Sequence, residues 1–97
     1  SEKVTTICNL EQCELLDCSN CKNLNSIKNL TSCKEIICTD CSNLETLVNI
    51  FNCQKLNCQR CKKLQTLPKL DRCTKLNCWD CENLLSLPKL DQCTELN

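Results

Sequence analysis

The stretch CTKLNCWDCENLLSLPKLDQ, residues 73–92, repeats the pattern of the twenty residues before it, CQKLNCQRCKKLQTLPKLDR, residues 53–72. Each unit begins with a cysteine, followed five residues later by a second and three residues after that by a third. The same triplet begins at Cys13 and Cys33, and Cys93 starts a further unit. A short repeat of fixed period predicts a solenoid, in which each unit is stable only when stacked on its neighbours. Any residue fixed within the repeat then forms a column along the stack.

The apolar residues of each unit follow one template, which in the first unit occupies positions 13, 16, 18, 21, 24, 27 and 30. In all units between residues 13 and 92 these positions hold only Leu, Ile or Cys. Most steps are three residues, which fits no α-helix because its period is 3.6. The single step of two marks a place where side chains alternate, which is typical of a strand. We therefore expect parallel strands, stacked about 4.8 Å apart, at Leu15–Cys18, Glu35–Cys38, Lys55–Cys58 and Lys75–Cys78.

The steps of three residues suit polyproline-like, 3₁₀-like or turn backbone on the other side of the coil. Pro68 and Pro88 lie on that side, where proline costs no ladder hydrogen bond if the backbone is not in a sheet. The expected fold is therefore a single β-solenoid of about 4.5 turns with short parallel strands and an irregular or 3₁₀ convex side. Its parts are a partial N-terminal turn (1–12), four full repeats (13–92) and a truncated fifth repeat (93–97).

The repeat resembles the leucine-rich repeat, LxxLxLxxN/CxL, in its cysteine-containing class, over the unit Cys73-x-x-Leu76-x-Cys78-x-x-Cys81-x-x-Leu84-x-x-Leu87-Pro88-x-Leu90. The resemblance covers nearly the whole chain, and the third cysteine of each unit stands at the family's Asn/Cys position. It implies a curved, right-handed solenoid whose strand face binds a partner, usually a protein. Cysteine replaces leucine at the first consensus position and again at the end of the strand, so the resemblance does not explain two of the three sulfur columns.

Charge and composition exclude several classes of function. The 12 basic and 12 acidic residues balance, which argues against a nucleic-acid partner and against binding to a membrane surface. No apolar run approaches the roughly 20 residues of a membrane span. The chain has no His and no Gly, hence no histidine base and no glycine-rich phosphate loop, and only Cys8 stands apart from the repeated cysteines. We therefore expect no enzyme activity.

Fourteen cysteines in 97 residues fit either of two compartments. An oxidising compartment would favour a disulfide framework, and a reducing one would favour free thiols or metal ligands. The first residues, Ser1–Thr6, contain no signal-peptide core, which favours an intracellular, reducing location such as the cytoplasm. A glycosylation sequon at Asn29-Leu30-Thr31 leaves secretion open.

The cysteine spacing suggests a metal site. The CxxxxCxxC pattern matches the first part of the plant-type iron–sulfur ligand run, and CxxC is the usual half-site for zinc. Stacking would bring two half-sites together, and the absence of His favours sulfur-only ligation. We expect an iron–sulfur cluster, or alternatively zinc, with the ligands Cys18, Cys21, Cys38, Cys41, Cys58, Cys61, Cys78 and Cys81. The alternative ligands are Cys13, Cys33, Cys53, Cys73 and Cys93.

A second hypothesis needs no metal, because free cysteine is often buried and packs as a small apolar residue. The chain would then be an interaction scaffold with reduced cysteine ladders. Trp79 and Ile37 are the outward apolar residues expected to anchor a partner, beside the amide column that contains Asn57 and Asn77. Expected partners are a protein on the strand face, a redox partner, or a second copy bound end to end.

Overall fold

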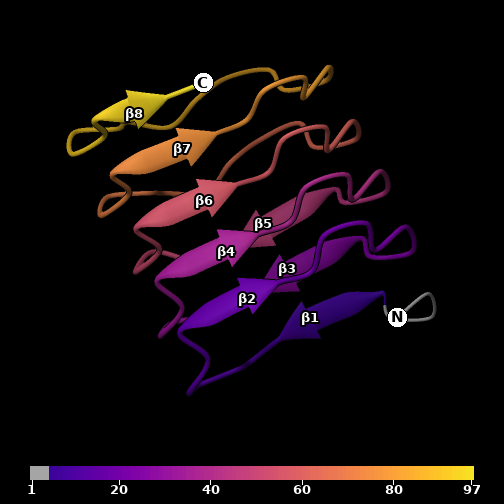
Figure 1. Ribbon diagram of the computed structural model, residues 1–97, viewed down its shortest axis with the longest axis horizontal. Helices are drawn as coiled ribbons and strands as arrows, with labels where there is room; N and C mark the ends of the chain where they lie inside the picture. Colours follow the sequence, from indigo (N-terminus) through magenta and orange to yellow (C-terminus); the bar gives the residue numbers. More distant parts are fainter. Residues whose placement is uncertain (1–4) are drawn as a thin grey trace.

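The computed structural model describes residues 5–97, so the first residues of the predicted partial N-terminal turn lie outside the described part. The described chain is a β-solenoid of about five stacked coils, about 20 residues apart, without a helix. Figure 1 shows the coils ascending from the N-terminal to the C-terminal end. The molecule is a thin slab with extents of 36 × 32 × 15 Å. The predicted solenoid is confirmed.

The larger of two parallel sheets has the strand order β2-β4-β6-β7-β8. Its strands are β2 (Leu15–Asp17), β4 (Glu35–Ile37), β6 (Lys55–Asn57), β7 (Lys75–Asn77) and β8 (Glu95–Leu96). The first four coincide with the predicted strands, apart from the terminal cysteine of each prediction. Ile36 stands opposite Leu16 on one side and Leu56 on the other, so residues twenty apart lie side by side.

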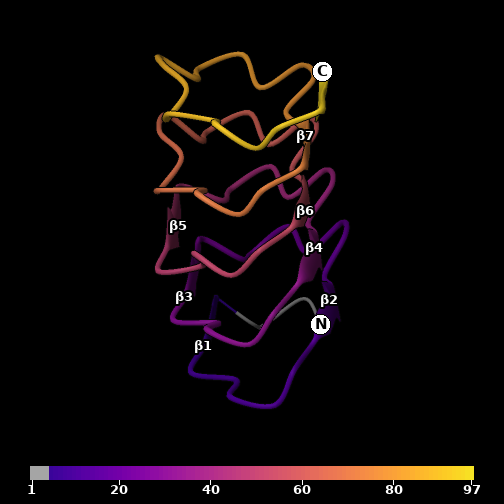
Figure 2. The same cartoon turned by 90° about the vertical axis from the view of Figure 1, so that its left-hand side faces the viewer.

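In the first three coils the opposite side holds a second parallel sheet, which corrects the prediction of an irregular or 3₁₀ convex side there; at residues 65–70 and 85–90 this side contains no strand, as predicted. The strands of the second sheet are β1 (Thr6–Cys8), β3 (Ser26–Lys28) and β5 (Thr46–Val48), in the order β1-β3-β5. Figure 2 shows the two sheets as facing walls. Each of these strands has only one inward residue, such as Ile27 between Ser26 and Lys28, so the sequence contains no step of two to reveal it.

The apolar template forms the core between the two sheets. Every template position from residue 13 to residue 92 is buried or partly buried, except Leu87. Burial is complete in the middle coils, as at Ile36 and Leu64, and it falls toward both ends of the stack. The stability of the fold therefore comes mainly from the middle coils, where apolar side chains are removed from water on all sides.

Left-handed backbone at fixed places in the repeat turns the chain without glycine. The residues with positive φ, between 56° and 62°, are Asn9, Asn20, Asn29, Asp40, Asn49, Arg60 and Asp80. Asn and Asp tolerate this region because their short polar side chains bond locally to the backbone. Arg60 is the only one of these residues outside that class.

Candidate functional site

The three sulfur columns have different hydrogen-bond partners. In the first column each thiol donates to the carbonyl oxygen two residues later in its own coil, at 3.1 to 3.4 Å. The donors are Cys13, Cys33, Cys53, Cys73 and Cys93. Burial raises the pKa of the Cys53 thiol to about 12, so this thiol keeps its proton at neutral pH. The first column therefore fixes the start of each strand within its own coil.

The third column reaches into the preceding coil. Cys41 donates to the carbonyl of Cys18 at 3.1 Å, and Cys61 donates to that of Cys38 at 3.0 Å. Cys81 repeats the contact with the Cys58 carbonyl, at 3.0 Å. Each bond joins residues 23 apart, so the link runs diagonally from one coil to the next. These buried carbonyls, which lie just after the strands, are thereby satisfied.

In two of the diagonal pairs the thiols also shift each other's pKa. Two effects raise the pKa of the Cys58 thiol above its ordinary value: the larger is its interaction with the Cys81 thiol, and the second is burial. The same interaction lowers the pKa of Cys81, and the backbone N–H groups of Cys61 and Arg60 add to this effect. Cys18 and Cys41 repeat the relation. In these two pairs the sulfur of the third column is therefore the better place for negative charge.

Two thiols of one CxxC segment point to different neighbours. Cys81 donates to Cys58 in the coil before it, whereas Cys78 donates to the carbonyl of Asn97 in the coil after it, at 3.3 Å. Cys58 likewise contacts Cys81, while Cys61 contacts Cys38. The stacking places the predicted ligand columns side by side, but it brings their thiols together in twos.

This arrangement does not supply a centre with four thiolate ligands. In residues 5–97 no group of three or more His, Cys, Asp or Glu side chains comes together in a way that could hold a metal ion. The thiols of the middle and third columns are directed at backbone carbonyls and at each other, and four convergent sulfurs would require their side chains to turn. Binding of an iron–sulfur cluster or zinc stays a prediction from the spacing.

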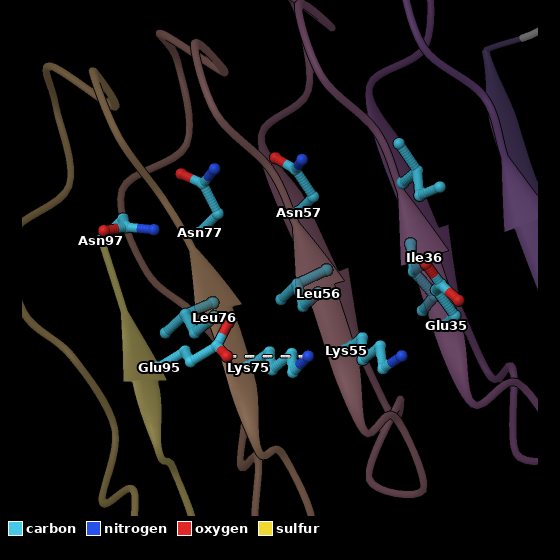
Figure 3. Close-up of a pocket in the computed structure, with 11 residues that line it drawn as sticks. Glu35, Ile36, Lys55, Leu56, Asn57, Lys75, Leu76, Asn77, Glu95 and Asn97 are labelled. Atoms are coloured by element: carbon cyan, nitrogen blue, oxygen red, sulfur yellow. Dashed lines mark ion pairs between the residues drawn. The ribbon is translucent and has the colours of Figure 1, made fainter.

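The face of the larger sheet is a shallow hollow along the stack. Figure 3 shows its polar side chains in two rows, with Leu56 and Leu76 between them. The lower row contains Glu35, Lys55, Lys75 and Glu95, and the upper row contains Asn57, Asn77 and Asn97. Lys75 and Glu95 form an ion pair at 3.6 Å. The face therefore offers charged groups and amide groups at a spacing fixed by the sheet.

Trp79 lies just after β7 and has 57% of its surface exposed. The guanidinium of Arg60, one coil earlier, stands 5.9 Å from the centre of its ring. Arg60 is held by Asp40 through two hydrogen bonds, Nε to Oδ1 at 2.9 Å and Nη2 to Oδ2 at 3.1 Å. The hydrogen bond from Arg60 lowers the pKa of Asp40, which keeps the carboxylate charged. Three coils thus contribute to one Trp–Arg–Asp chain.

The predicted partner-binding residues lie along this face but differ in exposure. Trp79 is exposed, whereas Ile37 and Asn57 are half-buried. Asn77 is also half-buried and accepts from the backbone N–H of Trp79 at 3.1 Å while it donates to Gln59 at 3.0 Å. It therefore positions the tryptophan. Arg60 was not predicted as a site residue, although its place in a charge column opposite Asp40 was the available signal.

A second hollow lies on the side of the smaller sheet, where β5 meets the next coil. Apolar side chains form part of its lining, namely Val48, Phe51, Leu67 and Pro68. No sequence pattern predicts this hollow, because it forms where Pro68 interrupts the sheet. Nothing in its lining selects one kind of ligand.

Comparison with protein-family models, with curated proteins and with solved structures gave no match. The resemblance to leucine-rich repeats stays a prediction, and the class that the structure defines is the cysteine-rich β-solenoid. In residues 5–97 no helix is long and apolar enough to cross a membrane.

Proposed function

We propose that this chain is a protein-interaction scaffold, a binding rather than a catalytic protein. Its thiols are structural hydrogen-bond donors, and its larger sheet face binds a protein partner. The observation that carries the proposal is Trp79, a large exposed side chain that Arg60 and Asp40 hold in place. Trp and Arg are the residue types that contribute most to binding at protein interfaces.

The Trp–Arg–Asp chain is organised before a partner arrives. The bidentate contact between Arg60 and Asp40 fixes the guanidinium, which in turn limits the positions open to the indole of Trp79. A side chain that is already ordered loses less conformational entropy on binding. The left-handed backbone of Arg60 also supports a role in binding. Asn or Asp occupies the corresponding place in the other coils at lower conformational cost, so arginine stands at this position in spite of a cost.

The neighbouring hollow adds charge to this surface. Glu35 and Lys55 form no ion pair with another described residue, whereas Lys75 pairs with Glu95. Both lie along one side of the hollow, where Lys55 is exposed and Glu35 is half-buried. The partner that fits is a protein with an apolar side chain against Trp79 and a carboxylate within reach of Lys55, since complementary charge favours both the rate and the specificity of association.

The proposal is tested by affinity capture from cell extract with three immobilised variants: the wild-type chain, Trp79→Ala and Phe51→Ala. Phe51 is the matched control, because it is also a large exposed side chain but lies at the other hollow. We expect a protein that binds the wild type and the control equally and binds Trp79→Ala at least about tenfold more weakly, as for a residue worth 1.4 kcal/mol or more. Equal binding to all three variants, or a loss confined to Phe51→Ala, would contradict the proposal.

Metal binding is the competing proposal, and it rests on the recurrent CxxxxCxxC spacing. Its strongest support in the structure is the lowered pKa of Cys41 and Cys81, since the thiolate is the form that binds metal. The divergence of the two thiols in each CxxC segment weighs against it. Metal content and thiol titration of anaerobically purified protein distinguish the two proposals.

A further inference from the structure

We propose that Cys58 and Cys81 form a site of reversible oxidation, at which a low-molecular-weight disulfide converts the two thiols into a cross-link between adjacent coils. The pair is defined by geometry. The Sγ atom of Cys81 lies 3.0 Å from the carbonyl oxygen of Cys58 in the preceding coil, so the side chain of Cys81 is directed at Cys58. A disulfide requires side chains that approach each other in this way. This inference goes beyond the proposed scaffold and does not depend on a binding partner.

Exposure selects this pair among the three diagonal pairs. Cys81 is partly exposed, so a soluble reagent can reach its sulfur. Cys38 and Cys61 are both fully buried, and in the third pair Cys41 is fully buried beside the almost fully buried Cys18. Thiol–disulfide exchange needs access for the attacking sulfur, so the order of reaction follows the exposure of the third-column cysteine.

The other two thiols of the same CxxC segments are directed at other residues. Cys78 is close in sequence to Cys81, but its thiol donates to Asn97 in the following coil. Cys61, in the coil of Cys58, donates to Cys38 in the preceding one. Neither the CxxC linkage 78–81 nor the linkage 58–61 matches these orientations, whereas the diagonal linkage 58–81 needs no change of coil register.

The reaction balances in two exchange steps. The thiolate of Cys81 attacks a reagent R–S–S–R, so that a Cys81–S–S–R bond forms and R–S⁻ leaves with the proton that Cys81 released. Cys58 then loses its proton and its thiolate attacks the Cys81 sulfur; the Cys81–S–S–R bond breaks, the Cys58–S–S–Cys81 bond forms, and RS⁻ takes up a proton and leaves as a second RSH. Each protein sulfur loses one electron, and the reagent gains two electrons and becomes two thiols. An excess of RSH reverses both steps.

The test uses oxidised glutathione as the reagent on the folded chain, followed by alkylation of the remaining thiols and peptide mapping without reduction. Cleavage after Arg60 separates Cys58 from Cys61, and cleavage before Asp80 separates Cys78 from Cys81. We expect the 58–81 linkage to form first, with the loss of two hydrogen masses, and the 38–61 linkage only after denaturation. The cross-link should raise the melting temperature by roughly 10 °C, and reductant should abolish the shift.

Two variants keep the proposal falsifiable. In Cys58→Ser the second step has no thiol, so the mixed disulfide should accumulate on Cys81 at least about tenfold above wild type, the ratio expected if the wild type resolves it by intramolecular attack. The matched control is Cys53→Ser, because Cys53 is also buried but donates within its own coil, and it should form the 58–81 linkage as wild type does. A first linkage at 78–81 or 58–78, or a mixed disulfide that persists on wild-type Cys81, would overturn the proposal.

Discussion

The coils before and after residue 60 share their sulfur columns and their larger sheet but differ on the opposite side. The first three coils pair through β1, β3 and β5, whereas residues 65–70 and 85–90 of the described chain contain no strand. In register, Lys28 stands opposite Val48, and one period later the same place holds Pro68. Proline has no backbone N–H to donate to a ladder. One residue per coil therefore decides whether the second sheet continues.

Two further features change at the same boundary. Asn49 donates to Asn29 at 2.8 Å and Asn29 donates to Asn9 at 3.1 Å, while the next residues of this column are Lys69 and Lys89. In the core, the column that contains Ile27 is partly buried at Ile7, buried at Ile27 and Leu47, partly buried at Leu67 and exposed at Leu87, where 44% of the surface is accessible. The second sheet thus closes the core on its side, and the coils without it are more open.

The largest expected difference between the regions concerns this core column. Leu47→Ala removes a side chain that is 3% exposed and should lower the free energy of unfolding by about 2–5 kcal/mol, because it leaves a cavity. Leu87→Ala, at the same place in the repeat, should cost less than about 0.5 kcal/mol because the side chain is already exposed. Denaturant unfolding of both variants measures the difference, and equal costs would show that the C-terminal coils are packed as tightly as the middle ones.

Proline placed in the two-sheet region should reproduce the C-terminal arrangement. Lys28→Pro removes a backbone donor from β3, the central strand of the smaller sheet, and leaves a neighbouring carbonyl without its partner. The expected loss in the free energy of unfolding is about 2 kcal/mol. Lys28→Ala is the control for the side chain and should be near neutral. An unchanged unfolding midpoint for Lys28→Pro would mean that the smaller sheet adds no stability.

The diagonal hydrogen bonds from thiols to carbonyls should contribute most to stability where they are buried. Cys61→Ala removes a thiol that donates to the Cys38 carbonyl inside the core, and the unsatisfied carbonyl should lower the free energy of unfolding by about 1–2 kcal/mol. Cys21→Ala is the control in the same column, because Cys21 is partly exposed, and it should cost about 0.5 kcal/mol or less. If both changes cost the same, the third column stabilises by packing alone.

The smallest expected effect is the extension of the second sheet by one coil. The double change Pro68→Val and Lys69→Asn copies Val48 and Asn49, restores a backbone donor and extends the asparagine ladder. The free energy of unfolding should rise by about 1 kcal/mol or less, because the gain of hydrogen bonds is partly offset by the greater freedom of the unfolded chain without proline. Slowed hydrogen exchange of the new amide at position 68 is the direct measurement. Fast exchange there would show that proline is not what ends the sheet.

The period and the inward columns could be predicted from the sequence, because a residue repeated at fixed spacing in a stack must stand beside its copies. The four predicted strands of the larger sheet followed from the step of two between Leu or Ile and Cys, in which alternation is visible. The smaller sheet could not be predicted, since one inward residue in a three-residue strand leaves no alternation. The diagonal contact between Cys81 and Cys58 could not be predicted. It depends on the direction of the Cys81 side chain, and the spacing of the cysteines gives no information about that direction.

The central claim is that the thiols are reduced and structural in the folded protein. Anaerobic purification, metal analysis and thiol titration before and after denaturation test this directly, with circular dichroism to show that the chain is folded. We expect all 14 cysteines to titrate as free thiols in denaturant, only the exposed and partly exposed ones to react in the native state, and no metal in stoichiometric amount. Stoichiometric iron or zinc whose removal unfolds the chain would contradict the account.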